Sequence, residues 1–257
     1  KELRDSRQFG DYLAEYYMRK VDNKINELKN VTYYARYVDD IIVIFTPKYE
    51  YDPEYFCKIN NEKKYFEKIE KIVTNVGLKL NKSKKKTKKY DLLIKEEKVY
   101  DDLEYLGYRF EFYNKIKKEN IQNIKIYLTD NKIKRYKEKI KQAFKAYNVE
   151  KYNDSNKAYR YLKNRIKFLT GNTRLVNNKN KILVGIFSSN LLLTEIETLK
   201  KLDNYLIWYI RRNVNKIAHK NKLLKSSFYK GFLDRGNNYY SFNSRQFEQI
   251  MSIWKSI

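Results

Sequence analysis

The chain has 257 residues, and Lys plus Arg outnumber Asp plus Glu by 56 to 31, a net charge of +25 that indicates a polyanionic partner, with nucleic acid favoured over a membrane surface. One cysteine, Cys57, and one histidine, His219, exclude an intrachain disulfide and any site built from several of either residue. No apolar run approaches the ~20 residues of a membrane span, so we expect a cytoplasmic protein.

Residues 10–24 are predicted to form an amphipathic helix. Apolar side chains recur every fourth residue at Leu13, Tyr17 and Val21, which places them on one helical face.

The next segment holds two adjacent carboxylates between predicted strands. Residues 32–37 and 41–45 are rich in β-branched and aromatic side chains, so they predict a hairpin with Asp39 and Asp40 in its turn. Asp is common in turns for its own hydrogen bonding. However, adjacent carboxylates repel each other, and apolar flanks raise the cost of ionising both. Oxygen ligands without Cys or His favour Mg²⁺, so the pair indicates a magnesium site.

After the hairpin, residues 47–62 are interpreted as a loop that carries both prolines. A helix is predicted at 62–76, and Gly77 stands where a helix C-cap glycine belongs. The alternation in residues 78–80 suits an edge strand, and a strongly basic stretch follows at 82–89.

From residue 128 the pattern becomes helical. Thr129 offers a capping hydroxyl for a basic helix whose apolar residues recur between 133 and 144. Further helices are expected at 154–169, 191–213 and 244–256.

Three segments resemble, in order, motifs of bacterial reverse transcriptases, the branch that contains retron, group II intron and defence-associated enzymes. Residues 37–40 resemble the Tyr-x-Asp-Asp catalytic hairpin. Residues 77–87 resemble the Gly-Leu-x-Leu-Asn-x-x-Lys-Thr motif with two extra residues, and residues 105–110 resemble the Phe-Leu-Gly-Tyr-x-Phe hairpin. The helix at 10–24 is similar to the palm helix of this family, whose preceding loop corresponds to residues 4–9.

The resemblance implies an RNA-directed DNA polymerase that uses two Mg²⁺ ions and dNTPs, with an RNA template or non-coding RNA and a DNA product. It implies that Asp39 and Asp40 are the catalytic metal ligands, and that Lys86, or Lys84 because of the insertion, acts on the pyrophosphate leaving group. The residues implied at the primer and substrate are Arg36, Tyr37, Val38, Leu106, Gly107 and Tyr108. Those expected to bind nucleic acid are Lys84, Lys85, Lys132, Lys134 and Arg135.

The family's third metal-binding carboxylate lies on an upstream strand that has no counterpart here. We therefore expect the segment to be the carboxy-terminal part of a longer polymerase. The expected fold is α+β, in which residues 1–115 form the carboxy-terminal portion of a palm, with an antiparallel catalytic hairpin plus helices. Residues 116–172 would form a helical thumb and residues 173–257 a helical extension, and a protein partner or an oligomer is left open.

The part beyond residue 150 is similar to the helical tails of defence-associated, abortive-infection reverse transcriptases, which favours a role in bacterial antiviral defence. Two alternatives stay open. One is a retron or mobile-element reverse transcriptase, which upstream sequence and neighbouring genes would distinguish. The other is a non-catalytic, basic RNA-binding module on a polymerase scaffold, which predicts RNA binding unchanged by Asp39→Asn and no metal-dependent incorporation.

Overall fold

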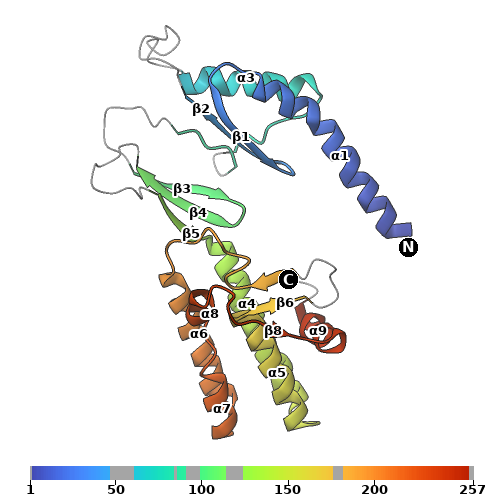
Figure 1. Ribbon diagram of the computed structural model, residues 1–257, viewed down its shortest axis with the longest axis vertical. Coiled ribbons are helices and arrows are strands. Elements are labelled where there is room, and N and C mark those ends of the chain that lie inside the picture. The colour runs from blue at the N-terminus through green and yellow to red at the C-terminus, as the bar shows by residue number, and fades with distance from the viewer. Residues whose placement is uncertain are drawn as a thin grey trace. The chain divides into compact units, whose positions relative to one another are not determined.

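The computed structural model describes residues 2–46, 61–83, 86–90, 99–113, 124–175 and 182–254. The chain folds into two compact units, Lys1–Glu97 and Lys98–Ile257 (Figure 1). The fold is α+β, as predicted, and its hairpins are antiparallel. Within the described ranges, no helix combines the length and the apolar character that crossing a membrane requires.

The described residues of the first unit form an antiparallel hairpin and two helices. These elements are α1 (Glu2–Asn26), β1 (Val31–Tyr37), β2 (Asp40–Phe45) and α3 (Asn61–Asn75). Val21 and Ile25 of α1 and Val73 of α3 are buried together, and Tyr34 and Val43 of the hairpin pack against them. The helices and hairpin predicted here are therefore confirmed, and the hairpin rests on a small apolar core.

Two local predictions in this unit were wrong. Residues 4–9 belong to helix α1 rather than to a loop, because they hold good helix formers such as Arg and Gln and no glycine or proline. Residues 78–80 pair with no strand among the described residues; instead Leu78 and Leu80 pack against the apolar core. Most of the loop predicted at 47–62 lies outside the described residues, which resume at residue 61. Residues 61 and 62 belong to α3.

The second unit begins with a three-stranded antiparallel sheet and continues as helices around a small second sheet. Its first elements are β3 (Val99–Tyr105), β4 (Tyr108–Tyr113), β5 (Ile124–Leu128), α4 (Asp130–Glu150), α5 (Ser155–Thr170), β6 (Asn172–Arg174) and β7 (Leu183–Gly185). They are followed by α6 (Glu197–Asn213), α7 (Ile217–Leu223), α8 (Phe228–Leu233), β8 (Tyr240–Ser241), α9 (Ser244–Met251) and the 3₁₀ turn η1 (Ser252–Trp254). The strand order is β3-β4-β5 in the first sheet and β7-β6-β8 in the second, where β6 and β8 are parallel.

The helical boundaries agree with the sequence pattern where caps are present. Thr129 is the N-cap of α4, and its hydroxyl accepts a hydrogen bond from the Lys132 backbone N–H at 3.3 Å, which confirms the predicted cap. The helix predicted at 191–213 begins only at Glu197, because residues 190–196 form turns in which Thr194 hydrogen-bonds to β5.

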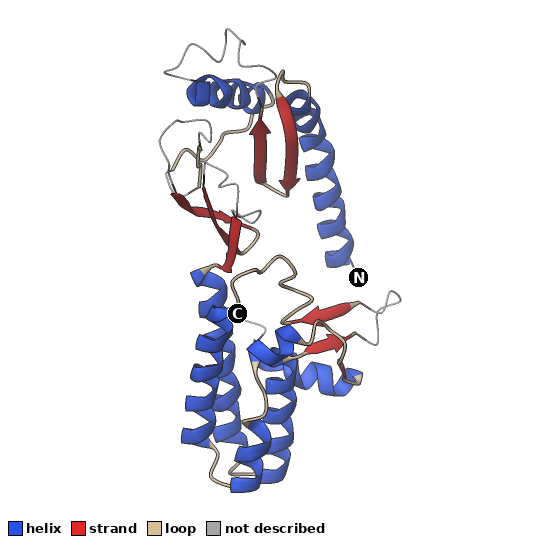
Figure 2. Ribbon diagram, turned by 60° about the vertical axis from the view of Figure 1, so that its left-hand side comes forward, coloured by secondary structure: helices blue, strands red, loops and turns tan. Residues whose placement is uncertain are grey.

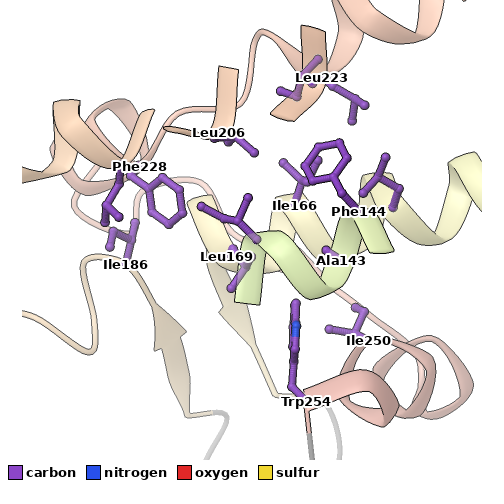
Figure 3. Close-up of a cluster of buried hydrophobic side chains, with 14 of the residues drawn as sticks. Ala143, Phe144, Ile166, Leu169, Ile186, Leu206, Leu223, Phe228, Ile250 and Trp254 are labelled. Carbon is purple, nitrogen blue, oxygen red and sulfur yellow. The ribbon is translucent and has the colours of Figure 1, made fainter. Parts of the chain in front are cut away.

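One hydrophobic core runs through the helices of the second unit. Figure 3 shows Phe144 of α4, Ile166 of α5 and Leu206 of α6 in this core together with Phe228 of α8 and Trp254 of η1. The long helices lie alongside one another (Figure 2). The parts expected as thumb and extension thus share a single core. The hairpin β3–β4 also belongs to this unit, which begins at Lys98.

Candidate active site at the carboxylate hairpin

A tight turn joins β1 to β2 and presents the two carboxylates. Tyr37 pairs with Asp40, so the turn consists of Val38 and Asp39 alone, and Asp40, which was predicted in the turn, is the first residue of β2. Both carboxylates are exposed, and the side chains of Tyr37 and Val38 are each 61% exposed. The structure therefore brings the four residues of the Tyr-x-Asp-Asp motif together at an accessible hairpin end.

The backbone of this turn is strained. Val38 has a φ of +57°, a left-handed conformation that β-branched residues avoid. Such a conformation costs an ordinary L-residue about 1–2 kcal/mol. Glycine or asparagine would adopt it more readily, so something outside the turn has to hold Val38 there.

Arg36 holds the turn against helix α1. Its guanidinium hydrogen-bonds to both oxygens of Asp22 at 2.8 and 3.0 Å and to both oxygens of Glu15 at 3.1 and 2.7 Å. It also donates to the Val38 carbonyl oxygen at 2.8 Å. These contacts use all five N–H groups of the side chain, which is 8% exposed. The resemblance implies that Arg36 contacts the substrate. In the structure, its N–H groups instead donate to other residues of the protein.

The charges in this cluster stabilise one another. The hydrogen bond from Arg36 lowers the pKa of Glu15. Burial acts to raise the pKa of Asp22, but hydrogen bonds from Arg36 and from Tyr34, whose hydroxyl lies 2.5 Å away, outweigh it and lower that pKa. Burial and the bond to Asp22 raise the pKa of Tyr34. At neutral pH, Glu15 and Asp22 are therefore ionised and Tyr34 is protonated, which are the states that their hydrogen bonds require.

Asp22 and Glu15 are the residues of this site to which the sequence analysis assigned no role. They lie seven residues apart, so two helical turns place them on one face of α1. The signal that could have found them is this spacing of two acids on the helix that precedes the hairpin, combined with a basic residue just before its turn.

The donor set at the turn fits part of a magnesium site. Mg²⁺ takes oxygen ligands from one or two carboxylates, with substrate and water completing its shell, and Asp39 and Asp40 supply two such groups. In the ranges that the structure describes, no three His, Cys, Asp or Glu side chains gather closely enough to hold a metal ion. A third carboxylate, as the resemblance implies, would therefore have to come from elsewhere.

The resemblance implies that Lys86 acts on the pyrophosphate leaving group. This residue belongs to the same unit as the carboxylate hairpin. Lys86 is exposed, and its backbone N–H donates to the Ser83 carbonyl at 2.9 Å. The neighbouring Thr87 hydroxyl donates a hydrogen bond to the Asn81 carbonyl at 2.5 Å. Lys84 and Lys85 lie outside the described residues.

The second hairpin turn, in the other unit, is also strained. Leu106 has a φ of +49° and Gly107 of +79°, and Tyr105 pairs with Tyr108 across them. Tyr108 is buried, whereas Leu106 is exposed at the turn. A side chain at Gly107 would meet the Lys132 stem, since a Cβ there would lie 3.3 Å from Lys132 Cδ.

Lys132 packs inward, while its neighbours on α4 do not. Its Nζ lies 4.7 Å from the centre of the Tyr108 ring and donates to the Ser189 carbonyl at 3.4 Å, and burial lowers its pKa. Lys134 and Arg135 are exposed. The structure thus joins Lys132 to the second hairpin and leaves the other two predicted nucleic-acid ligands accessible.

Comparisons of the chain with models of protein families, with curated proteins and with solved structures found no match.

Proposed function

We propose that this chain contains the catalytic hairpin of an RNA-directed DNA polymerase, a reverse transcriptase acting in bacterial antiviral defence. The observation that carries the proposal is the exposed Asp39-Asp40 pair on a turn whose valine is held in a left-handed conformation. Strained backbone concentrates where a function requires it. Arg36 donates one hydrogen bond to the Val38 carbonyl and its others to Asp22 and Glu15 of α1, an anchoring that would be hard to explain if the turn only connected two strands.

In this proposal each residue of the hairpin has its own task. Asp39 and Asp40 would hold Mg²⁺, which when bound would stabilise charge on the attacking and leaving oxygens of nucleotidyl transfer. Arg36 is a positioning residue, because it fixes the Val38 carbonyl and hence the direction of both carboxylates. Tyr37, exposed beside them, offers a ring against which a primer terminus could rest. Lys86 would supply a cation or a proton for the pyrophosphate leaving group.

A second candidate is a non-catalytic RNA-binding module. Two observations favour it: within the described residues no third acidic side chain joins Asp39 and Asp40, and the net charge of +25 is sufficient for RNA binding without catalysis.

The proposal is tested by incorporation of labelled dNTPs with Mg²⁺ in the polypeptide as the cell makes it, including any residues encoded upstream. Asp39→Asn should reduce incorporation by at least about 100-fold, since a catalytic metal is worth several kcal/mol. Asp101→Asn is the matched control, because Asp101 is an exposed carboxylate on a strand of the other hairpin. Equal incorporation by wild type and Asp39→Asn would overturn the proposal.

A further inference from the structure

An open groove between α4 and α6 of the second unit shares no residue with the carboxylate hairpin. It has a volume of about 760 Å³ and adjoins a second open hollow, of about 550 Å³, on the surface of α6. The larger is lined by residues of α4, α6 and the turns after them, among them Lys141, Lys145, Lys151, Tyr152, Tyr209 and Arg212. The smaller is lined by Asn204, Ile207, Trp208, Arg211 and Arg212. Because Arg212 lines both hollows, we treat them as one surface, the α4–α6 groove.

The charge in this groove has one sign. Its cations are Lys141, Lys145 and Lys151 from α4 and the turn after it, and Arg211 and Arg212 from α6. No Asp or Glu is among the described residues that line it. Part of this charge is offset, since Lys141 forms an exposed ion pair with Glu138 at 3.7 Å, whereas Lys151 donates only to the neutral Asn148 side chain. An unbalanced row of cations favours a ligand with repeated negative charge, such as a phosphate backbone.

Exposed aromatic side chains lie among these cations. Trp208 is 50% exposed and Tyr152 is 84% exposed. The Arg212 guanidinium lies 5.1 Å from the centre of the Trp208 ring, and Tyr209 meets that ring edge-on at 4.8 Å. A single exposed aromatic is ordinary on a protein surface. An exposed tryptophan fixed by its neighbours inside a basic groove is the arrangement that proteins use to stack on unpaired bases.

We propose that the α4–α6 groove binds single-stranded nucleic acid. Lys141, Lys145 and Arg212 would neutralise phosphates, while Trp208 and Tyr152 stack on bases. A duplex hides its base faces within its own stack, so these aromatic rings favour a single strand. The proposal is independent of the polymerase proposal, since binding here needs neither Mg²⁺ nor the carboxylate hairpin.

The chain carries its own optical probe for this contact. It has two tryptophans; Trp254 is buried at 4% exposure, whereas Trp208 is half exposed. Titrating the full chain with single-stranded 20-mers of oligo(U) and oligo(dT) should quench tryptophan emission, because a stacked base quenches the indole. In Trp208→Phe the remaining emission should not respond, although the labelled 20-mer still binds by anisotropy. Trp208→Ala should weaken that binding about 5- to 150-fold, the range measured for loss of one base stack.

The phosphate contacts are tested by salt dependence. A variant with Lys141→Gln, Lys145→Gln and Arg212→Gln should lower the slope of log affinity against log salt by about 2, as expected for three lost contacts to a single strand. The matched control, Lys225→Gln, Lys230→Gln and Arg245→Gln, removes the same charge from exposed positions outside the groove. Circular dichroism melting would confirm that both variants fold.

Three results would overturn the proposal: equal slopes for the two charge variants, quenching that persists in Trp208→Phe, or a duplex 20-mer that binds as tightly as the single strands and quenches equally. Loss of dNTP incorporation in Asp39→Asn without any change in these binding curves would separate this groove from the carboxylate hairpin.

Discussion

Arg36 illustrates how much a single residue's role depends on its surroundings. A basic side chain beside two carboxylates in a cationic chain is readily interpreted as a ligand for substrate phosphate. In the structure its side chain is 8% exposed, and Asp22, Glu15 and the Val38 carbonyl take up its donors. The sequence contains these partners but cannot show that helix α1 turns them toward β1.

Replacing Asp22 tests the contribution of the Arg36 contacts to stability. Asp22→Asn should lower the free energy of unfolding by about 1.5–3 kcal/mol, the usual worth of hydrogen bonds to a charged group, because Arg36 would keep its charge while losing the more buried of its two counter-ions. Urea unfolding monitored by circular dichroism measures this change. The matched variant Glu15→Gln should cost less, since Glu15 is 59% exposed. A larger loss in Glu15→Gln than in Asp22→Asn would contradict the assignment.

The same carboxylate predicts a dependence on pH. The pKa of folded Asp22 is lowered below its unfolded value, so its stabilising contribution is complete above the unfolded pKa of ~3.9 and is lost as pH falls through the folded value. The stability difference between wild type and Asp22→Asn should therefore shrink as the pH is lowered from 5 toward 2. A difference that stays constant over this range would show that Asp22 does not act through its charge.

The strain at Val38 makes a separate prediction. Val38→Asn should raise the free energy of unfolding by about 1 kcal/mol, because asparagine tolerates the left-handed conformation and the valine side chain is mostly exposed. If the strained turn serves catalysis, dNTP incorporation should fall in the same variant despite its higher stability. Thermal unfolding and incorporation, measured on one preparation, give both results; a destabilised variant would show that no strain was stored there.

At the scale of elements, periodicity and caps predicted most of the helices and the carboxylate hairpin. Thr129 marked the start of α4 correctly because its capping hydrogen bond is local. The strand predicted at 78–80 failed, since alternation alone cannot show whether a partner strand is present, and here Leu78 and Leu80 pack against α1 and α3 residues instead. Strands β6 and β8 were missed because each is only two or three residues long and depends on pairing across the chain.

Packing between elements is tested at two glycines. Gly231 of α8 lies against the end of α5, where an added Cβ would overlap the Thr170 carbonyl oxygen. Gly231→Ala should destabilise the fold by at least about 1–3 kcal/mol, the cost of overpacking a filled site. Gly10→Ala is the control: Gly10 lies within α1 with no atom within 4 Å of an added Cβ, so the change should stabilise by about 0.5–1 kcal/mol. Chemical unfolding measures both, and a neutral Gly231→Ala would contradict the packing.

For the molecule as a whole, the sequence predicted that the positive charge serves a nucleic acid but not where each charge lies. Lys132 and Lys139 lie on the same basic helix as Lys145, yet their side chains pack over the rings of Tyr108 and Trp254. The α4–α6 groove could not be read from any motif, because Lys145 and Arg212 are brought to one hollow only by the packing of α4 and α6 around their shared core. Long-range packing therefore decides which cations remain for a ligand.

The most direct test of the carboxylate hairpin as an active site uses the polypeptide as the cell makes it, as wild type and as Asp39→Asn. RNA binding and dNTP incorporation are measured on the same samples. We predict that both proteins bind RNA equally, since Asp39 is one exposed carboxylate in a chain of net charge +25, and that only the wild type incorporates dNTPs with Mg²⁺. If the wild type binds RNA tightly and incorporates nothing, the hairpin is not an active site and the chain is an RNA-binding module.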